Sequence, residues 1–493
     1  MAGGADTKER PDIGGWCSSR REEACMGADP KSAGLCVEAP PPRKRVFILG
    51  GGFAGMYAAL HLERRLGKRD DVEVTLVSRD NFFLFTPMLH EVAASDVNAS
   101  AIVISLRKLL PRLTFVEGDV SGLDLEAKKV TVAHGGLDGH SHTLAYDYLV
   151  LALGSETNFF GKPGPRDYTL TMKTLGDAML LRNCLIDRLE EADTDCVTAG
   201  RRDAIVTFVV VGGGFAGVET AGAINDFIHG ALPYYPNIQH ANVRVMLVHG
   251  GKEVLPELGE DLGAYARKKL IEHGVEVRTG VHVKDVTQEG VELPDGTVVP
   301  TKTVVWTAGV TPPSLMATLP CEKERGRLKV NERMEVPGFP GVWALGDCAS
   351  VPDVTNGGKP CPPTAQHALR QGLVAARNVC AAMEGKPGKA LRYKMLGQLA
   401  AIGRRSGVAR ILGMKFSGTF AWVLWRTIYL SKLPKLETKV RVAMGWTLDL
   451  FFRKDVVQLI GPRELDQLTL PALPLNSRQQ VRQVQALQPR TQH

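Results

Sequence analysis

The sequence lacks any regular pattern of cysteines. Its nine cysteines are scattered, odd in number and contain no C-x-x-C pair. This spacing argues against a disulfide framework and against a structural zinc site. We therefore expect a reduced, intracellular protein that holds no metal ion.

Long apolar runs are also missing. The longest uncharged stretch, Thr303 to Cys321, is broken by Gly309, Pro312, Pro313 and Pro320, so it cannot cross a membrane as a helix. The first 44 residues contain no apolar run of signal-peptide length. We expect residues 1–44 and the Gln- and Arg-rich tail at 476–493 to be disordered.

Acidic residues are almost absent from one segment near the C-terminus. Between Leu391 and Gly445, eleven Lys and Arg residues stand against a single acid, Glu437, although the whole chain has a formal charge of only +7. The basic residues are interleaved with aromatic ones rather than arrayed on one polar face. This pattern argues against nucleic acid as a partner and favours a membrane surface.

A glycine-rich loop follows the first apolar strand. RVFILGGGFAGMYAALHLERR, from Arg45, is typical of a strand, a G-x-G-x-x-G loop and an amphipathic helix, and VEVTLVSRD supplies the next strand. In this context the loop and the helix N-terminus bind the pyrophosphate of a dinucleotide. The candidate binding residues are Gly50, Gly52, Phe53, Ala54 and Gly55.

The same pattern recurs 162 residues further along the chain, in TFVVVGGGFAGVETAG. The candidate residues here are Gly212, Gly214, Phe215, Ala216 and Gly217, and VRVMLVHGG is the following strand. Two such loops indicate one flavin that stays bound and one nicotinamide that exchanges. The alternative is a duplicated domain in which one site has degenerated.

Three further glycine turns belong with these loops. YDYLVLALGSETN places Gly154 after a strand, VVWTAGV does the same for Gly309, and VWALGDCAS ends a strand in Gly346 and Asp347. Asp347 is placed to accept hydrogen bonds from the ribityl hydroxyls of a flavin, or else merely caps the next turn. Beside two glycine loops we favour the first interpretation.

Taken in order, these motifs resemble the two-dinucleotide-binding flavoproteins, and within them the type II NADH dehydrogenases, which are non-pumping NADH:quinone oxidoreductases. The segments NFFLFTPMLHEVAA, PPTAQHA, GRRSGVA, AWVLWRTIYLSKLP and LDLFF add to the resemblance, which runs from about Arg45 to Leu459. It implies an α/β fold with two Rossmann-like domains, the NAD domain being inserted in the FAD domain, and a C-terminal membrane-associating region. It also implies FAD and NADH as cofactors.

The expected boundaries follow from this order of motifs. We place the first part of the FAD domain at 45–165, the NAD(P)H domain at 166–300 and the second part of the FAD domain at 301–385. The C-terminal membrane or dimer region then covers 386–475.

Both dinucleotide sites lack the acid that usually ends the second strand and binds the adenosine ribose. Ser78 stands there in the first site and His249 in the second, with Lys252 three residues further on. A cation would attract the 2′-phosphate of NADPH, whereas a neutral His249 would donate a hydrogen bond to the ribose of NADH. We expect NADH, with NADPH as the alternative.

The resemblance assigns the reacting groups. The helix that begins at Ala365 and Gln366 lies against the flavin ring in the similar enzymes, where its backbone N–H groups stabilise the negative charge of the reduced ring. Gln366 also faces the quinone, and Arg370 occupies the position of a second family glutamine. Glu219 matches a glutamate that steers the nicotinamide or passes protons, or else is only a favourable charge near a helix N-terminus.

The segment that begins at Lys415 predicts an amphipathic helix in a membrane interface. Its apolar surface consists of Phe416, Phe420, Trp422, Val423, Trp425, Ile428, Tyr429 and Leu430. We expect a homodimer that is peripheral on the cytoplasmic face of the cell membrane, most simply a bacterial inner membrane, with anionic lipid and membrane quinone as partners. A buried dimer helix is the competing interpretation.

Two other functions fit parts of the sequence. A sulfide:quinone oxidoreductase would share FAD and quinone but use redox cysteines, for which Cys184, Cys196 and Cys361 are available. A non-catalytic, nucleotide-sensing flavoprotein would keep both loops without a quinone site. A disulfide reductase is excluded because the helix after the first loop, MYAALHLERR, has no C-x₄-C.

Overall fold

The computed structural model describes residues 43–135, 139–194, 198–452 and 454–458. The predicted disordered segments at 1–44 and 476–493 lie outside these ranges, apart from Arg43 and Lys44. Lys44 is the first residue of strand β1 (Lys44–Leu49), so the first domain begins one residue before the predicted boundary at residue 45.

The first parallel sheet has the strand order β22-β9-β1-β2-β5. Besides β1, its strands are β2 (Val72–Ser78), β5 (Thr114–Glu117), β9 (Tyr148–Leu151) and β22 (Val342–Ala344). They are mostly buried apolar residues, as expected for a parallel sheet covered on both faces. Because β22 returns far along the chain to complete this sheet, the predicted insertion of one domain in the other is confirmed.

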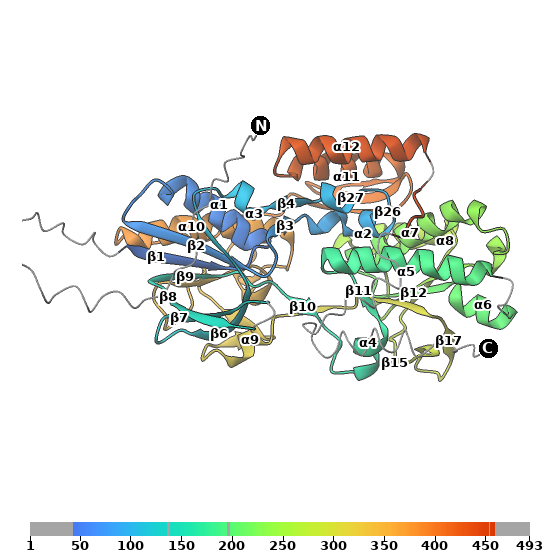
Figure 1. Cartoon of the computed structure of the whole chain (residues 1–493), viewed down its shortest axis with the longest axis horizontal. Helices are drawn as coiled ribbons and strands as arrows, with labels where there is room; N and C mark the ends of the chain where they lie inside the picture. The colour runs from blue at the N-terminus through green and yellow to red at the C-terminus, as the bar shows by residue number, and fades with distance from the viewer. Residues whose placement is uncertain (1–42, 136–138, 195–197, 453, 459–493) are drawn as a thin grey trace, which may run out of the picture. The chain divides into compact units, whose positions relative to one another are not determined.

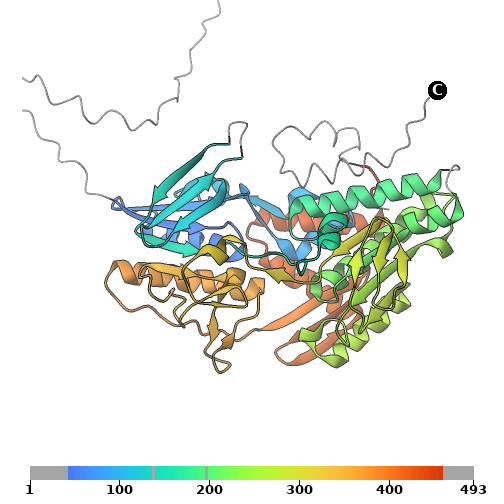
Figure 2. The same cartoon turned by 90° about the horizontal axis from the view of Figure 1, so that it is seen from below.

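Helix α1 (Phe53–Leu66) connects β1 to β2, and α10 (Ala365–Met383) packs against it. A Cβ at Gly372 would lie 2.4 Å from the carbonyl oxygen of Ala54 and 2.9 Å from the amide nitrogen of Ala58, so glycine permits this close approach of the two helices. Figure 2 shows α10 on one side of the first sheet and the three-stranded sheet β6 (Asp119–Asp124), β7 (Lys129–Ala133) and β8 (Ser141–Ala145) on the other.

The second parallel sheet has the order β11-β18-β12-β13-β14. These strands are β11 (Leu170–Thr171), β12 (Thr207–Val211), β13 (Arg244–His249), β14 (Val275–Thr279) and β18 (Thr303–Trp306). The accompanying helices are α5 (Leu175–Asp193), α7 (Phe215–Ala231) and α8 (Glu260–Glu272). The boundary that we placed between residues 300 and 301 is therefore one strand too early, because β18 follows it and hydrogen-bonds to β12.

A two-stranded ribbon connects the two sheets. Strand β10 (Glu156–Thr157) pairs antiparallel with β19 (Val310–Thr311), and β10 lies between the two domains in Figure 1. The chain leaves the first domain through β10 and returns through β19. This ribbon therefore joins the two parallel sheets.

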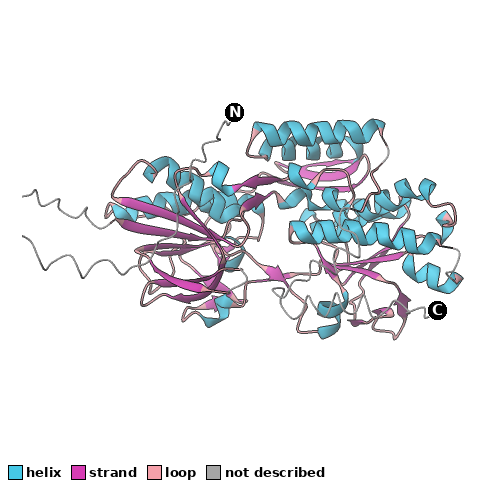
Figure 3. Cartoon of the chain, in the orientation of Figure 1, coloured by secondary structure: helices cyan, strands magenta, loops and turns pink. Residues whose placement is uncertain are grey.

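The C-terminal region is an antiparallel sheet covered by two helices (Figures 1 and 3). Its elements are β26 (Gly397–Gly403), β27 (Ser406–Ile411), β28 (Met414–Ser417), α11 (Gly418–Lys432) and α12 (Leu436–Phe451). Helix α11 packs on β27, and β26 packs on α7 of the second domain. In the part of the chain that the structure describes, no helix is long and apolar enough to cross a membrane.

Shorter elements complete the described fold. The helices are α2 (Leu89–Ala93), α3 (Leu106–Leu109), α4 (Pro163–Tyr168), α6 (Ala199–Ile205) and α9 (Leu315–Thr318). The strands are β3 (Phe82–Leu84), β4 (Val103–Ser105), β15 (Asp285–Val286), β16 (Gly290–Glu292), β17 (Val298–Pro300), β20 (Lys323–Glu324), β21 (Arg327–Lys329), β23 (Ala349–Ser350), β24 (Pro352–Asp353) and β25 (Lys359–Pro360).

Candidate functional site

The first glycine loop lies at the carboxyl end of β1 and has the geometry that a dinucleotide requires. Gly50 has φ +107°, and a Cβ there would lie 2.2 Å from the carbonyl oxygen of Ala152. A Cβ at Gly55 would lie 1.8 Å from the carbonyl oxygen of Gly50, whereas one at Gly52 would meet nothing within 4 Å. Gly52 is the N-cap of α1 and offers no side-chain cap, so the free N–H groups of the helix suit a phosphate.

Ser78 lies at the end of β2 and backs this loop. A Cβ at Gly51 would come within 2.6 Å of the Ser78 hydroxyl oxygen, and Ser78 is buried. The predicted ribose position is therefore next to the loop, as the sequence indicated. Gly154 has φ +71° in the turn after β9, with no atom within 4 Å of the Cβ position, so this turn leaves room for a ligand.

The second loop repeats this geometry at the carboxyl end of β12. Gly212 has φ +114°, and a Cβ at Gly217 would lie 1.7 Å from its carbonyl oxygen. Gly214 caps α7 without a side-chain hydrogen bond. Gly309 follows β18 with φ +152°, close to the ring of Phe160, so it lies in the turn that leads into the ribbon strand β19.

His249 lies beneath the second loop. The backbone N–H of Gly213 donates to His249 Nδ1 at 3.1 Å, so the proton of the neutral ring is on Nε2. That Nε2 atom is buried and makes no hydrogen bond of normal geometry within the described residues. Burial lowers the pKa of His249, which keeps the ring neutral. The backbone of Glu253 opposes this shift, so the ring also interacts with the loop after β13.

Asp347 lies in the turn after β22, beside the first loop. Its Oδ2 accepts a hydrogen bond from the Ser155 hydroxyl at 2.8 Å, and Lys173 Nζ donates to the same hydroxyl at 2.8 Å. Burial lowers the pKa of Lys173, and Asp347 opposes this shift. Gly346, with φ +74°, approaches the side chain of Ala54 in the first loop. The Gly-Asp turn and the first loop thus form one site.

Helix α10 begins as predicted at Ala365, with Thr364 as N-cap. Gln366 is held at both ends of its amide: Nε2 donates to the carbonyl of Gly397 at 2.7 Å, and Oε1 accepts from the Tyr393 hydroxyl at 2.9 Å. One N–H and one lone pair of this amide are left over. The guanidinium of Arg370 lies 5.4 Å from the centre of the Tyr393 ring.

Gln371 of α10 is a site residue that the sequence motifs did not single out. It is almost fully buried, and its Oε1 accepts a hydrogen bond from the backbone N–H of Gly346 at 2.7 Å. This bond fixes the Gly346 turn to α10. The sequence did not reveal this role, because the partner turn comes from a different part of the chain, which the helix pattern alone does not show.

Glu219 is buried on α7, at the contact with the C-terminal region. Its Oε1 accepts hydrogen bonds from the backbone N–H of Ala401 at 3.2 Å and from the indole N–H of Trp425 at 3.1 Å. Burial raises the pKa of Glu219 to about 8, and the two hydrogen bonds oppose this shift. Most of this carboxyl is therefore protonated at pH 7.

Strand β26 hydrogen-bonds to two of the predicted reacting residues, Gln366 and Glu219. Gly397, its first residue, binds Gln366, and Ala401, four residues further on, binds Glu219. Four residues of a strand span about 13 Å. The C-terminal sheet therefore holds both candidate residues at a fixed separation.

Aromatic rings form a continuous wall between the first loop and Glu219. Phe53 of α1 contacts Phe85, Phe85 contacts Tyr429, and Tyr429 contacts Trp425, with ring centres 5.8, 6.0 and 4.7 Å apart. Trp425 then donates to Glu219. The prediction that Trp425 belongs to a membrane-facing surface was wrong, because its side chain is fully buried and its indole N–H donates to a buried carboxyl.

The thiols considered for sulfide chemistry do not form a redox pair in the described structure. Cys184 lies on α5 and Cys361 precedes α10, and both are free thiols. Burial raises the pKa of the Cys361 thiol to about 11, which makes it a poor nucleophile. Cys196 lies outside the described residues.

Comparisons with known proteins agree with this geometry. A family model described as pyridine nucleotide-disulphide oxidoreductase matches residues 44–372, and one described as NDH2 C-terminal domain matches residues 395–455. The type II NADH:quinone oxidoreductase Ndh of Mycobacterium tuberculosis is 33% identical over 426 residues, which cover 83% of this chain and 88% of that protein.

Two solved structures have a similar fold. NDH2 from Plasmodium falciparum in complex with NADH matches with a TM-score of 0.78 and 20% identity, over 84% of this chain and 100% of that one. The sulfide:quinone oxidoreductase of Aquifex aeolicus matches less well, with a TM-score of 0.62 and 19% identity over 83% and 95% of the two chains. At these identities the likeness establishes the fold and not the roles of individual residues.

Proposed function

The chain belongs to the type II NADH:quinone oxidoreductases of the pyridine nucleotide-disulphide oxidoreductase family, and from that premise we propose which of its residues carry the reaction. It is an FAD-dependent enzyme that oxidises NADH and reduces a quinone without pumping protons. FAD, when bound, supplies the two-electron chemistry that links these two substrates. The protein supplies binding, orientation and protons.

The first loop is the proposed FAD site. Its open Gly52 position and the free N–H groups of α1 suit the pyrophosphate, and Asp347 has an oxygen left to bind a ribityl hydroxyl. The N-terminus of α10 directs the backbone N–H groups of Ala365 and Gln366 toward the site. The residues that we assign to FAD are Gly50, Gly52, Phe53, Ala54, Gly55, Ser78, Gly154, Gly346, Asp347, Ala365 and Gln366.

The second loop is the proposed NADH site. We assign to it Gly212, Gly214, Phe215, Ala216, Gly217, His249 and Gly309. His249 is neutral, and Lys252 is exposed and paired with Glu260 at 3.4 Å. A neutral donor suits a ribose hydroxyl and gives no charge to a 2′-phosphate, which supports NADH over NADPH.

Glu219 is the proposed proton donor to the quinone. The observation that carries this assignment is its buried carboxyl, kept protonated at the end of an aromatic wall and bound to the same strand as Gln366. An apolar wall suits a quinone ring. Gln366 and Arg370, beside Tyr393, are the proposed polar groups for the other end of the quinone.

Replacement of Glu219 tests this assignment. Glu219→Gln keeps the size and the acceptor for Trp425 but cannot give up a proton. We expect quinone reduction to fall by about 10²-fold, while reduction of the flavin by NADH keeps its rate. A variant that reduces quinone at the wild-type rate would contradict the assignment, and a wild-type protein that binds both nucleotides but reduces no quinone would favour the non-catalytic alternative.

Helix α12 is the proposed membrane contact, with α11 beside it. An exposed apolar stripe with four-residue spacing runs along α12 through Leu436, Val440, Met444 and Leu448. Phe420 and Val423 of α11 are exposed as well, and Lys432 adds a cation at the end of that helix. We propose that this face docks on anionic lipid at the cytoplasmic face of the cell membrane, where the quinone is dissolved.

Two measurements test the docking proposal. Flotation with vesicles of phosphatidylglycerol and of phosphatidylcholine is expected to show preference for the anionic lipid, and Val440→Asp together with Met444→Asp is expected to abolish it. Equal flotation of this double variant would overturn the assignment of the face. We also propose a homodimer; since Trp425, Trp446 and Arg426 pack within the protomer, its interface would use other residues of the C-terminal helices, and sedimentation velocity tests the assembly.

A further inference from the structure

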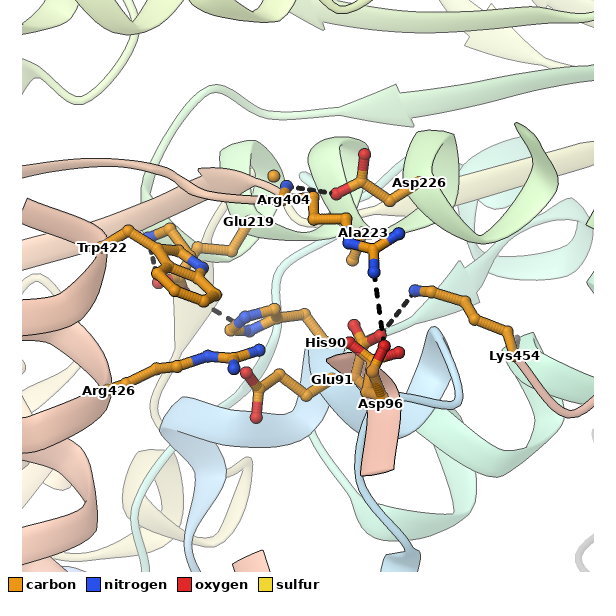
Figure 4. Close-up of a pocket in the computed structure, with 13 residues that line it drawn as sticks. His90, Glu91, Asp96, Glu219, Ala223, Asp226, Arg404, Trp422, Arg426 and Lys454 are labelled. Atoms are coloured by element: carbon orange, nitrogen blue, oxygen red, sulfur yellow. Dashed lines mark hydrogen bonds and ion pairs between the residues drawn. The ribbon is translucent and has the colours of Figure 1, made fainter. Parts of the chain in front are cut away.

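A small polar cavity adjoins Glu219 on α7. Its volume is about 40 Å³, and its walls come from α2, α7, the β26–β27 turn, α11, α12 and the segment around Lys454. A water needs about 10–15 Å³ of such space, so the cavity has room for a short chain of waters. Figure 4 shows the side chains of His90, Glu91 and Glu219 on its walls.

His90 presents an unsatisfied nitrogen to this cavity. The side chain is more than nine-tenths buried, its Nδ1 lies 3.7 Å from Glu219 Oε2, and its Nε2 has no hydrogen-bond partner in the described structure. Burial lowers the pKa of His90 to about 3, with Lys454 adding to the shift, so the ring is neutral. A buried, unpaired ring nitrogen on a cavity of this size calls for a bound water.

Glu91 is a second buried carboxyl on the same wall. Its Oε2 accepts a hydrogen bond from the indole N–H of Trp446 at 2.9 Å. Burial raises the pKa of Glu91 to about 8; the nearby Asp96 adds to this shift, and Arg426 opposes it. At pH 7 the cavity therefore contains a carboxylic acid that has a proton to give and that does not contact the proposed quinone wall.

The other charged groups lead from Glu91 toward the surface. Asp96 pairs with Lys454 at 2.6 Å, and Asp226 accepts a hydrogen bond from the backbone N–H of Arg404 at 2.5 Å. Arg404 is exposed and donates to the carbonyl of Asp449 at 3.3 Å. Figure 4 shows Lys454 paired with Asp96, and Arg404 beside Asp226. One end of the cavity thus adjoins Glu219, and the other end reaches solvent-exposed Arg404.

Arg426 and Trp422 of α11 also line the cavity. The Arg426 guanidinium lies 4.0 Å from the centre of the Trp422 ring and 4.7 Å from that of Trp446, and its Nε has no partner within the described residues. The charged side chains that line the cavity around Glu91 are Asp96, Arg426, Lys454, Asp226, Arg404 and Asp449.

We propose that this cavity delivers the proton that quinone reduction takes from the medium, with Glu91 as the relay residue that reprotonates Glu219 through water bound to His90. The proposal rests on the proposed role of Glu219. NADH gives two electrons and one proton, whereas a quinone needs two electrons and two protons to become a quinol, so one proton per turnover comes from solvent.

The relay moves protons and no electrons. The O–H bond of Glu219 breaks as an O–H bond forms on the quinone oxygen, which leaves the Glu219 carboxylate. Glu91 then gives its proton through the cavity water to Glu219, and the Glu91 carboxylate takes a proton from solvent at the Arg404 end. Each carboxyl returns to its protonated form before the next turnover.

The test compares Glu91→Gln with Glu63→Gln in the flavin-loaded protein. Glu63 of α1 is also a buried acidic residue, but its Oε1 accepts a hydrogen bond from the backbone N–H of Arg112, and it does not line the cavity. Each variant is reduced with NADH, and the rate of reoxidation is measured with a soluble quinone and with ferricyanide, which takes electrons and no protons. We expect E91Q to slow reoxidation by quinone by about tenfold or more and to leave reoxidation by ferricyanide unchanged.

The control and the remaining outcomes decide the proposal. E63Q is expected to match the wild type with both acceptors. Equal slowing of E91Q with both acceptors indicates a structural defect and overturns the relay, as does an unchanged rate with quinone. If E91Q fails to retain flavin, Asp96→Asn is the second variant: it leaves the Glu91–Trp446 bond intact but removes a charge that helps to keep Glu91 protonated. It is expected to show the same quinone-specific slowing, and its absence overturns the relay. A wild-type protein that reduces no quinone overturns the proposed function instead.

Discussion

The two glycine loops share one backbone geometry but have different surroundings. Gly50 and Gly212 have φ of +107° and +114°, and each is overlaid by a glycine five residues later that leaves no room for a Cβ. The first loop is enclosed by α10, which packs on α1 and holds the Gly346 turn through Gln371. The same phosphate cradle thus suits a resident dinucleotide in the first domain.

The second loop is backed by the side chain of His249 instead. His249 accepts a hydrogen bond from the loop, and its Nε2 makes no hydrogen bond of normal geometry within the described residues. On the proposed assignment, both loops would bind a pyrophosphate, and the elements around each loop would decide whether the nucleotide stays or exchanges.

Among the positions at which the helices after the two loops differ is one that carries a titratable side chain in both. Tyr57 follows Gly50 by seven residues, and Glu219 follows Gly212 by the same number. Burial raises the pKa of both groups, but only the carboxyl is brought into a range where it exchanges protons near neutral pH. The second helix therefore carries the group that we propose for proton transfer, and the first helix has no counterpart at this position.

The largest expected effect comes from filling the two loops with a methyl group. Gly55→Ala and Gly217→Ala each place a Cβ within 2 Å of a carbonyl oxygen. We expect G55A to lose bound flavin almost completely, and G217A to keep its flavin but lose at least about 100-fold in the rate of its reduction by NADH. Flavin absorbance after gel filtration and stopped-flow bleaching measure the two effects.

Gly200→Ala is the matched control for this pair. Gly200 lies on α6, and a Cβ there meets nothing within 4 Å, so we expect wild-type flavin content and wild-type bleaching. Loss of flavin in both loop variants would mean that the two sites do not differ as described.

The pH dependence of Glu219 sharpens the comparison between the two helices. Because the protonated carboxyl is the donor and its pKa is about 8, quinone reduction is expected to be constant below pH 8 and to fall about tenfold per pH unit above it. The rate of flavin reduction by NADH does not need this proton and is expected to stay flat. A quinone profile that stays level up to pH 10 would contradict the assignment.

The same carboxyl makes stability depend on pH. Its pKa rises from 4.5 in the unfolded chain to about 8 in the folded protein, so the folded state binds the proton more tightly. The contribution of this group to the free energy of unfolding is therefore largest below pH 4.5, and it is lost as the pH rises from 4.5 through 8. In Glu219→Gln this decline is expected to shrink by an amount on the order of 1 kcal/mol, measured by urea unfolding at pH 6 and pH 9.

A smaller effect is expected from the bond that closes the first site. Gln371→Leu leaves the N–H of Gly346 without its buried acceptor, at a cost of about 1–3 kcal/mol. We expect FAD to bind about tenfold more weakly, while the KM for NADH is unchanged. Fluorescence titration of the apoprotein with FAD measures the first, and a parallel rise in both constants would show a general loss of folding.

The smallest effect is expected at the ribose position of the second site. His249→Arg adds a fixed charge where a 2′-phosphate would lie, and a charge-assisted hydrogen bond contributes about 1.5–3 kcal/mol. We expect the KM for NADPH to fall by about tenfold and flavin content to stay the same. An unchanged preference for NADH would place the ribose away from His249.

The sequence was sufficient for the features that depend on short patterns. Both glycine loops and the start of α10 at Ala365 follow from local motifs, and the late return of β22 to the first sheet was implied by the family resemblance. Gln371 and Glu91 were missed, although Glu91 lies within a motif that supported the resemblance. Their roles arise from contacts with Gly346 and Trp446, each from another part of the chain.

Two further errors have the same origin. The boundary at residue 300 separated β18 from the sheet that it joins, because the apolar run after Pro300 does not reveal its partner strand. Trp425 was assigned to a membrane face, but its N–H is held by Glu219, which is 206 residues away in sequence. A periodic apolar pattern identifies a buried face and not what covers it.

One anaerobic experiment tests the central claim that the first site keeps a flavin which NADH reduces from the second. Purified flavin-loaded protein is mixed with NADH, and with NADPH in a separate sample, while the visible flavin band is followed. The account predicts fast bleaching by NADH, slower bleaching by NADPH, and recovery of the band when a soluble quinone is added. A flavin band that neither nucleotide bleaches would contradict it.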